Sequence, residues 1–130
     1  MKFQYLDAHS HQVGKGRVFN YDLIKFQDNI PKGQMISTGI HPWWAKDITF
    51  LQFRGMIENV RESMNLCAIG ETGIDKIKGR HLDTQIKLFS YHLKIADELK
   101  LNVILHCVKG FNEIMAVQKI TGKRIVKYDT

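Results

Sequence analysis

Short apolar segments alternate with amphipathic segments along this 130-residue chain, and this alternation restricts the fold more than any other feature of the sequence. The apolar segments predict short strands at residues 3–7, 35–40, 66–69, 102–106 and 124–128. The segments between them predict helices at residues 20–29, 50–64, 82–96 and 111–118. Strands and helices in this order form right-handed β-α-β units. The chain is therefore predicted to be an α/β protein with a parallel sheet and flanking helices.

The helical periodicity is strongest at residues 82–96 and weakest at residues 20–29. In the first segment, apolar residues recur at alternating steps of four and three, which places them on one face of a helix. The second segment has only a weak pattern and ends before Pro31. No linker or internal repeat divides the chain, so residues 1–130 are expected to form one domain. The chain is too short for a complete eight-stranded α/β barrel, which needs about 200 to 250 residues.

The composition and the charge exclude several classes of protein. Hydrophobic residues make up 44% of the chain, too many for a disordered protein, and two cysteines are too few for a disulfide scaffold. No apolar run approaches the roughly 20 residues of a membrane span, and the first residues do not resemble a signal peptide. We therefore expect a cytoplasmic protein without a membrane partner. The net charge of +6 favours an anionic partner such as nucleic acid, although a merely basic, soluble protein is an equal alternative.

Polar residues that can bind metal follow four of the expected strands. They occur in the segments Asp7-Ala8-His9-Ser10-His11, Gly39-Ile40-His41-Pro42, Gly70-Glu71-Thr72-Gly73-Ile74-Asp75 and His106-Cys107. The carboxyl ends of parallel strands meet at one edge of a sheet, where ligands of α/β proteins bind. His9 and His11 are two residues apart, so they face the same side of a strand and could bind one divalent ion. The sequence therefore predicts a metal site at this edge.

Each of these residues also has a structural explanation. An isolated pair such as His9 and His11 is more often one structural and one surface histidine. Glu71 could cap the next helix, and His106 could be a hydrogen-bonded histidine of the core. The convergence of four strand ends favours metal binding over these alternatives.

Two further groups of residues are less informative. His81 and His92 lie on the expected helix, away from the strand ends, and we expect both to be solvated. The adjacent Trp43 and Trp44 could stack on a nucleobase or pack across the mouth of the sheet, and packing is slightly favoured.

The motifs D-x-H-x-H, G-I-H-P, A-I-G-E-x-G-I-D and V-I-L-H-C, in this order over residues 7 to about 115, resemble those of the TatD-type metal-dependent deoxyribonuclease family. The resemblance implies roughly half of a TIM-type (β/α) barrel that hydrolyses phosphodiester bonds in DNA. It also implies one or two divalent metal ions, with Mg, Mn or Zn as candidates.

The resemblance also assigns roles to individual residues. It implies metal ligands at His9, His11, Glu71 and His106. Glu71 is the expected bridging and catalytic carboxylate. His41 and Lys109 are expected to contact the substrate, and Asp75 is expected to order the ligands from behind.

The chain also departs from the family pattern. Lys127 stands about where a further metal-binding histidine is expected. An incomplete barrel exposes strand edges, which a second copy of the chain could complete. The leading hypothesis is a TatD-like nuclease with DNA as its substrate. The alternatives are a catalytically incomplete remnant that binds metal or nucleic acid, and a related amidohydrolase that acts on a small carbonyl substrate.

Overall fold

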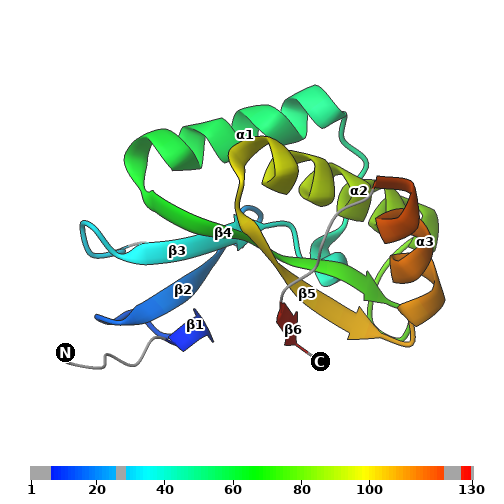
Figure 1. Ribbon diagram of the computed structural model, residues 1–130, viewed down its shortest axis with the longest axis horizontal. Helices are drawn as coiled ribbons and strands as arrows, with labels where there is room; N and C mark the ends of the chain where they lie inside the picture. Colours follow the sequence, from blue (N-terminus) through cyan, green and yellow to red (C-terminus); the bar gives the residue numbers. More distant parts are fainter. Residues whose placement is uncertain (1–6, 26–28, 122–126, 130) are drawn as a thin grey trace.

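The computed structural model describes residues 7–25, 29–121 and 127–129 (Figure 1). Within them one sheet contains the strands β1 (Asp7–Ser10), β2 (Arg17–Asp22), β3 (Met35–Gly39), β4 (Asn65–Asp75), β5 (Asn102–Val108) and β6 (Lys127–Asp129). The strands follow one another across the sheet in sequence order, and every neighbouring pair is parallel. This is the strand order of a (β/α) barrel, and it confirms the predicted partial TIM-type fold.

The helices lie together on one side of the sheet (Figure 1). They are α1 (Phe50–Ser63), α2 (Leu82–Leu99) and α3 (Phe111–Thr121), and a short 3-10 helix, η1 (Pro42–Trp44), follows β3. The side chain of Thr49 accepts the backbone N–H of Gln52 at 3.1 Å, and the side chain of Gln52 accepts that of Thr49 at 2.8 Å, so α1 begins at a capping box. Among the described residues, none of the helices is both long and apolar enough to cross a membrane.

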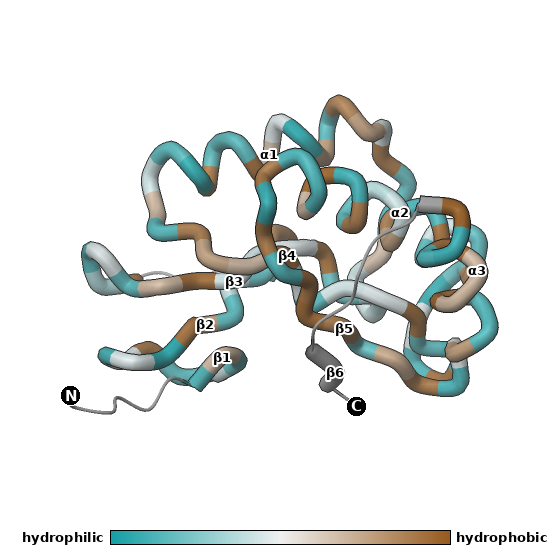
Figure 2. The backbone as a smooth tube through the Cα atoms, in the orientation of Figure 1, coloured by the Kyte–Doolittle hydropathy of each residue, from teal (hydrophilic) through white to brown (hydrophobic). Residues whose placement is uncertain are grey.

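The hydrophobic core lies between the helices and the sheet. Figure 2 shows hydrophobic residues along the strands and hydrophilic residues on the outer turns of the helices. Phe89 and Leu93, from the apolar stripe predicted for α2, are fully buried, as are Ile69 of β4 and Leu105 of β5. Burial of this stripe against the sheet stabilises the position of α2.

The prediction of a helix at residues 20–29 was wrong for its first part. Residues 17–22 form strand β2, in which Phe19 pairs with Ile36 of β3 and is 2% exposed. Residues 26–28 lie outside the described residues. The pairing of β2 with β3 begins at Phe19 and continues through residues 20–22. This pairing outweighs the weak helical preference of these residues. Parallel strands are normally joined by a dozen or more residues, whereas residues 11–16 alone join β1 to β2.

The third predicted strand was too short. Strand β4 was expected at residues 66–69 but continues to Asp75, so Glu71 lies inside the strand and not after its end. The pairing of β4 with β5 shifts register between Gly70 and Thr72. Glu71 therefore occupies a β-bulge, a feature that redirects a side chain and is frequent beside active sites.

The two terminal strands were predicted only approximately. The structure has β1 from Asp7 and β6 from Lys127, where strands at 3–7 and 124–128 were expected. Residues 3–6 and 124–126 of these predictions lie outside the described part of the chain.

Candidate metal centre

A cavity of about 570 Å³ opens where the carboxyl ends of the strands meet. Its lining consists of His11, Asn20, Asp22, Lys25, His41, Trp43, Trp44, Glu71, Asp75, Ile77, Lys78, His106 and Val108. Five of the predicted site residues are in this lining, namely His11, His41, Glu71, Asp75 and His106. The sheet therefore brings together residues that are up to 95 positions apart in the sequence (106 − 11).

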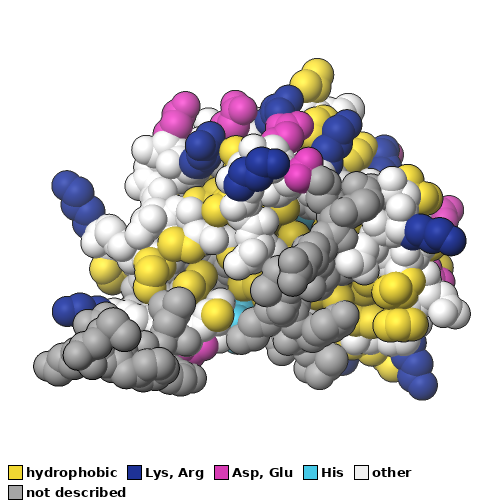
Figure 3. Space-filling view, in the orientation of Figure 1, with side chains coloured by type: hydrophobic (Ala, Val, Ile, Leu, Met, Phe, Trp, Pro, Cys, Tyr) yellow, Lys and Arg dark blue, Asp and Glu magenta, His cyan; other side chains and the backbone are white. Residues whose placement is uncertain are grey.

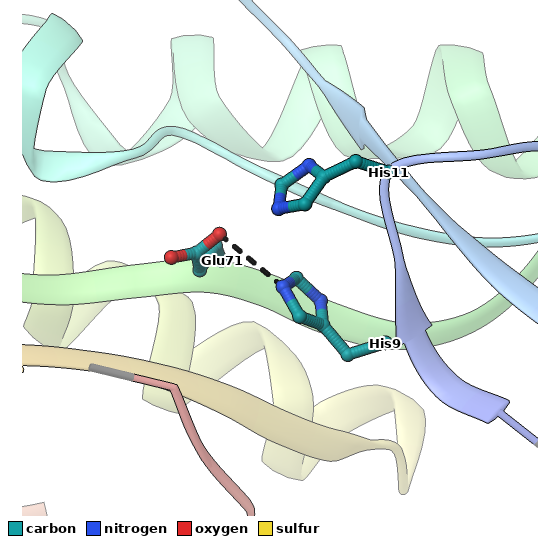
Figure 4. A group of neighbouring side chains, drawn as sticks. All are labelled: His9, His11 and Glu71. Atoms are coloured by element: carbon teal, nitrogen blue, oxygen red, sulfur yellow. Dashed lines mark ion pairs between the residues drawn. The ribbon is translucent and has the colours of Figure 1, made fainter.

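Glu71 lies between histidines from three different parts of the chain. Its Oε2 atom is 3.5 Å from Nε2 of His9, while its Oε1 atom is 3.3 Å from Nε2 of His41 and 3.0 Å from Nδ1 of His106. Figure 4 shows His9 and His11 extending from the β1 region toward the carboxylate of Glu71. The two oxygens of this carboxylate thus face different groups of histidines.

The backbone on both sides of Glu71 explains how the carboxylate reaches this position. The N–H of Glu71 donates to Oδ1 of Asn20 at 3.2 Å, and the same oxygen accepts from the hydroxyl of Ser37 at 3.3 Å. Gly70 has a φ of 138°, and a Cβ atom there would collide with the carbonyl oxygen of Ile104. Only glycine fits this close approach of β4 to β5, so Gly70 makes the bulge that aims Glu71 into the cavity.

The ligand atoms form two groups that share Glu71. In one group the ligand atoms of His9, His11 and Glu71 lie within 4.8 Å of one another, and in the other those of His41, Glu71 and His106 do. Two imidazoles and a carboxylate are a common ligand set for Zn²⁺ and other first-row divalent ions. The residues present therefore fit a divalent metal, and the shared carboxylate fits two.

His106 is enclosed by two carboxylates. Its Nδ1 lies 3.0 Å from Oε1 of Glu71, and its Nε2 lies 3.0 Å from Oδ2 of Asp75. Both partners can only accept, so the doubly protonated ring satisfies both. Burial disfavours the charged ring, but the hydrogen bonds to Glu71 and Asp75 outweigh it and raise the pKa of His106. For Glu71, burial is likewise outweighed by the hydrogen bonds from His106 and His41, which lower its pKa.

His41 has a defined tautomer when it is neutral. Its Nδ1 accepts the backbone N–H of Trp43 at 3.1 Å, which caps the short helix η1. The proton of the neutral ring is then on Nε2, where it can be donated to Oε1 of Glu71. This arrangement makes His41 a hydrogen-bond donor to the central carboxylate.

Asp75 is held by a dense set of hydrogen bonds. Its Oδ1 accepts the backbone N–H groups of Ile77 at 2.9 Å and Lys78 at 2.8 Å, and its Oδ2 accepts Nε1 of Trp43 at 2.7 Å. Burial opposes ionisation, but these bonds, together with the one from His106, lower the pKa of Asp75. Asp75 is thus an anchored carboxylate that contacts His106 at the nitrogen opposite Glu71, and its role in ordering a metal ligand stays a prediction.

Two residues of α2 support the centre, and neither was predicted to do so. Gln85 accepts the backbone N–H of Asp75 at 2.8 Å and donates to its carbonyl at 3.2 Å. His92 is fully buried, which makes the expectation of a solvated side chain wrong. Its Nε2 accepts the backbone N–H of Ile40 at 2.8 Å and its Nδ1 donates to the carbonyl of Leu88 at 2.6 Å, while burial lowers its pKa to about 4.

The structure also shows where His81, Lys109 and the two adjacent tryptophans lie relative to the cavity. His81 is exposed, as expected, and precedes α2 with a left-handed φ of 44°. Lys109 is exposed, with a left-handed φ of 59°, and it is not among the residues that line the cavity. Its contact with substrate stays a prediction. Trp43 and Trp44 are half-buried and line the cavity, and their stacking on a nucleobase stays a prediction.

Comparisons with known proteins agree with the fold of the chain. The sequence model of the family described as "TatD related DNase" matches residues 13–127. A solved structure of a TatD family hydrolase from Entamoeba histolytica superposes with a TM-score of 0.56 at 17% sequence identity, covering 82% of this chain and 40% of that one. At this identity the likeness shows the fold alone, and the chain spans about 40% of that relative's length. No curated protein matches the chain.

Proposed function

Because the chain belongs to the TatD related DNase family, we propose that it is a metal-dependent hydrolase of the TatD type that acts on the phosphodiester bonds of DNA. One observation carries this proposal above the others. Glu71 presents one oxygen to His9 and the other to His41 and His106, as a carboxylate shared between two ions would. The proposal also assigns a role to each residue around Glu71, as a metal ligand or as a partner of a ligand.

The residues that would hold the metal ions are His9, His11, Glu71 and His106, while His41, which belongs to the second group of candidate ligand atoms, is proposed to contact the substrate. Bound divalent ions would polarise a phosphoryl oxygen and lower the pKa of a water molecule. Imidazole ligands suit Zn²⁺, whereas carboxylate oxygens suit Mn²⁺ and Mg²⁺, and Mg²⁺ also retains several waters. The nitrogen-rich ligand set therefore supports Zn²⁺ over Mg²⁺.

The side chains around the ligands would keep them in place. Asp75 accepts a hydrogen bond from the Nε2–H of His106, so a divalent ion would have to displace the proton on Nδ1, the nitrogen that faces Glu71, for His106 to bind it. His41 donates toward the other side of the same Glu71 oxygen. Each of these contacts restricts a ligand before an ion arrives, which lowers the entropy lost on binding.

Charge near the cavity supports an anionic substrate. Figure 3 shows lysine and arginine side chains spread over the visible face and mixed with acidic side chains near α1. The cations in the cavity lining are Lys25 and Lys78. Attraction of a phosphodiester would therefore come from the mouth of the cavity as well as from the net charge of +6.

The test is hydrolysis of single-stranded DNA by the purified chain with Mn²⁺, Mg²⁺ or Zn²⁺. We expect cleavage that is abolished by a chelator and by Glu71→Ala. Glu58→Ala is the matched control, because Glu58 is an exposed carboxylate of α1 outside this cavity, and it should cleave like the parent chain. Cleavage that survives Glu71→Ala would contradict the proposal.

One departure from the family pattern favours a second candidate. Lys127 stands about where the family resemblance predicts a further metal-binding histidine. We therefore propose, as the alternative, a protein that binds metal and DNA without cleaving DNA. Metal binding and DNA binding, both measured on folded chain that leaves DNA intact, would select this candidate.

A second copy of the chain is a further proposed partner. In the described part of the sheet, β1 and β6 each pair with one neighbouring strand. An edge strand presents unpaired N–H and C=O groups that another strand can bind. Light scattering at several protein concentrations tests this, since a dimer is expected and a monomer at all concentrations would contradict it.

A further inference from the structure

Two pairs of tryptophan and lysine lie side by side in the lining of the cavity. The ammonium of Lys25 is 4.2 Å from the ring centre of Trp44, and that of Lys78 is 4.9 Å from the ring centre of Trp43. The two indole rings are 6.2 Å apart and nearly perpendicular, at 83°. All four residues line the cavity that contains Glu71.

The tryptophans and the metal centre are connected by short contacts. Trp43 donates Nε1–H to Asp75 at 2.7 Å, and its ring meets the ring of His41 edge to face, with centres 4.8 Å apart. The backbone N–H of Trp43 donates to Nδ1 of the same histidine. The helix η1 therefore fixes the aromatic wall relative to Glu71, while the lysines come from the segments after β2 and β4.

We propose that Trp43 with Lys78 and Trp44 with Lys25 form a nucleotide subsite, which binds neighbouring nucleotides of a single DNA strand beside the metal centre. This inference rests on the proposed function and names how its substrate is held. An indole face stacks on any base, and a base stacked on an aromatic ring contributes about 1–3 kcal/mol. Each ammonium lies over a ring face in the structure, so a base that stacks on that face would displace the ammonium, which could then pair with the phosphate of the same nucleotide.

The angle between the rings argues for a single strand. Bases that stack on two nearly perpendicular indoles cannot remain stacked on each other. A duplex keeps its bases parallel, so it would have to be opened first, at a cost of a few kcal/mol per base. A single strand already exposes its bases and avoids this cost.

A purely structural role for these pairs makes a different prediction. Exposed cation–π contacts contribute about 0.5–1 kcal/mol to stability without binding anything. The chain contains such a contact outside the cavity, where Lys94 of α2 is 4.4 Å from the ring centre of Phe50. Lys94→Gln is therefore the matched control for Lys25→Gln, because each removes one charge and one cation–π contact.

The experiment measures the binding of a short, fluorescently labelled oligothymidylate by anisotropy, in the presence of a chelator so that no hydrolysis occurs. A strand of the same length with abasic sites in place of the thymines keeps the phosphates and removes the bases. We expect Trp44→Leu to lower the affinity for oligothymidylate by about 5-fold or more and to leave the affinity for the abasic strand unchanged. Trp44→Phe, which keeps a ring, should restore part of the loss, and thermal melting checks that both variants fold.

The lysines are tested by the salt dependence of the same binding. Lys25→Gln should reduce the slope of log affinity against log salt by about 0.7, the value for one phosphate contact on a single strand. Lys94→Gln should leave both the slope and the affinity unchanged. Equal losses of affinity in Lys25→Gln and Lys94→Gln would overturn the subsite. So would a Trp44→Leu variant that still prefers oligothymidylate to the abasic strand as strongly as the parent chain does.

These results separate the subsite from the proposed hydrolase activity. Cleavage of DNA together with unchanged binding by Trp44→Leu would refute the subsite and keep the hydrolase. Base-dependent binding through Trp44 without cleavage at any metal concentration would keep the subsite and refute the hydrolase.

Discussion

Nε2 of His92 accepts the backbone N–H of Ile40 at 2.8 Å, so a histidine from α2 holds the backbone immediately before His41. Gly39 makes this contact possible, because a Cβ atom at residue 39 would lie 2.8 Å from the same ring nitrogen. The loop after β3 and the helix α2 are therefore joined through a buried ring. Every residue of η1, including Trp43, depends on the position of this loop.

The first prediction concerns the pH dependence of stability. The pKa of His92 is about 4 in the folded chain, below its value of 6.5 in the unfolded chain, so between these values the unfolded chain binds more protons. The contribution of neutral His92 is fully present above pH 6.5. It is lost as the pH falls toward 4, by up to about 3 kcal/mol in the free energy of unfolding.

Urea unfolding at a series of pH values checks this prediction. His92→Leu should be destabilised by about 1–3 kcal/mol near neutral pH, since the N–H of Ile40 loses its acceptor. It should also have a weaker dependence on pH than the parent chain. His81→Asn changes an exposed histidine with a left-handed φ and should keep the full dependence. Identical pH profiles for the parent and His92→Leu would be incompatible with this account.

The second prediction concerns Gln85. This side chain is 2% exposed and bonds to both the N–H and the carbonyl of Asp75. Gln85→Leu leaves these buried groups without that partner, so we expect a loss of about 2–4 kcal/mol in the free energy of unfolding. Gln52→Ala removes a glutamine with one role, the capping box of α1, and should cost about 1 kcal/mol. Equal losses in the two variants would show that the clamp on Asp75 contributes little.

The third prediction compares two glycines. Gly73 has a φ of 146°, and a Cβ atom there would collide with the carbonyl oxygen of His106 in the neighbouring strand. Gly73→Ala should therefore destabilise the chain by more than about 2 kcal/mol. Gly55 lies inside α1 with open space around its Cα, so Gly55→Ala should stabilise the chain by about 0.5–1 kcal/mol. Thermal unfolding measures both, and shifts in the same direction would contradict the prediction.

The fourth prediction concerns metal affinity, measured by calorimetric titration with Zn²⁺ or Mn²⁺. Glu71→Gln removes the charge that faces both groups of histidines, so we expect binding to fall below detection at one site or both. Asp75→Asn keeps all proposed ligands but weakens the acceptor behind His106, and should reduce affinity by about 10- to 100-fold. Asp47→Asn, at an exposed carboxylate outside the cavity, should bind like the parent. Full affinity in Glu71→Gln would exclude Glu71 as a ligand.

Much of the fold follows from local pattern. Helices α1, α2 and α3 begin at the predicted residues 50, 82 and 111, because their apolar stripes repeat over several turns. Strand β2 was missed, because Phe19 is buried next to the neighbouring strand β3 and no periodicity in its own segment indicates this burial. The bulge at Glu71 depends on how β4 meets β5, a relation between distant segments that no short window contains.

The composition of the candidate centre was predictable for one reason, which is that parallel strands end at a common edge. That rule brings the segments that contain His41, Glu71 and His106 together, although Glu71 and His106 lie inside β4 and β5 and not after their ends. The rule does not predict Gln85 or His92, because these residues lie on a helix and bond to the backbone of Asp75 and Ile40. A helix histidine has the same sequence signature whether it is solvated or buried, and only the packing of α2 on the sheet, where His92 meets Ile40, decides between them.

The candidate ligands lie on strands of very different length, and β1 is the shorter support. It has four residues, pairs with one strand in the described sheet, and carries His9 directly and His11 just after its end. Glu71 and His106, by contrast, lie in β4 and β5, which pair over seven positions. An ion held by both groups would therefore cross-link the edge of the sheet to its interior. Amide hydrogen exchange in β1 would slow far more on metal loading than exchange in β4, so the occupancy of the centre would set how firmly β1 is held against β2.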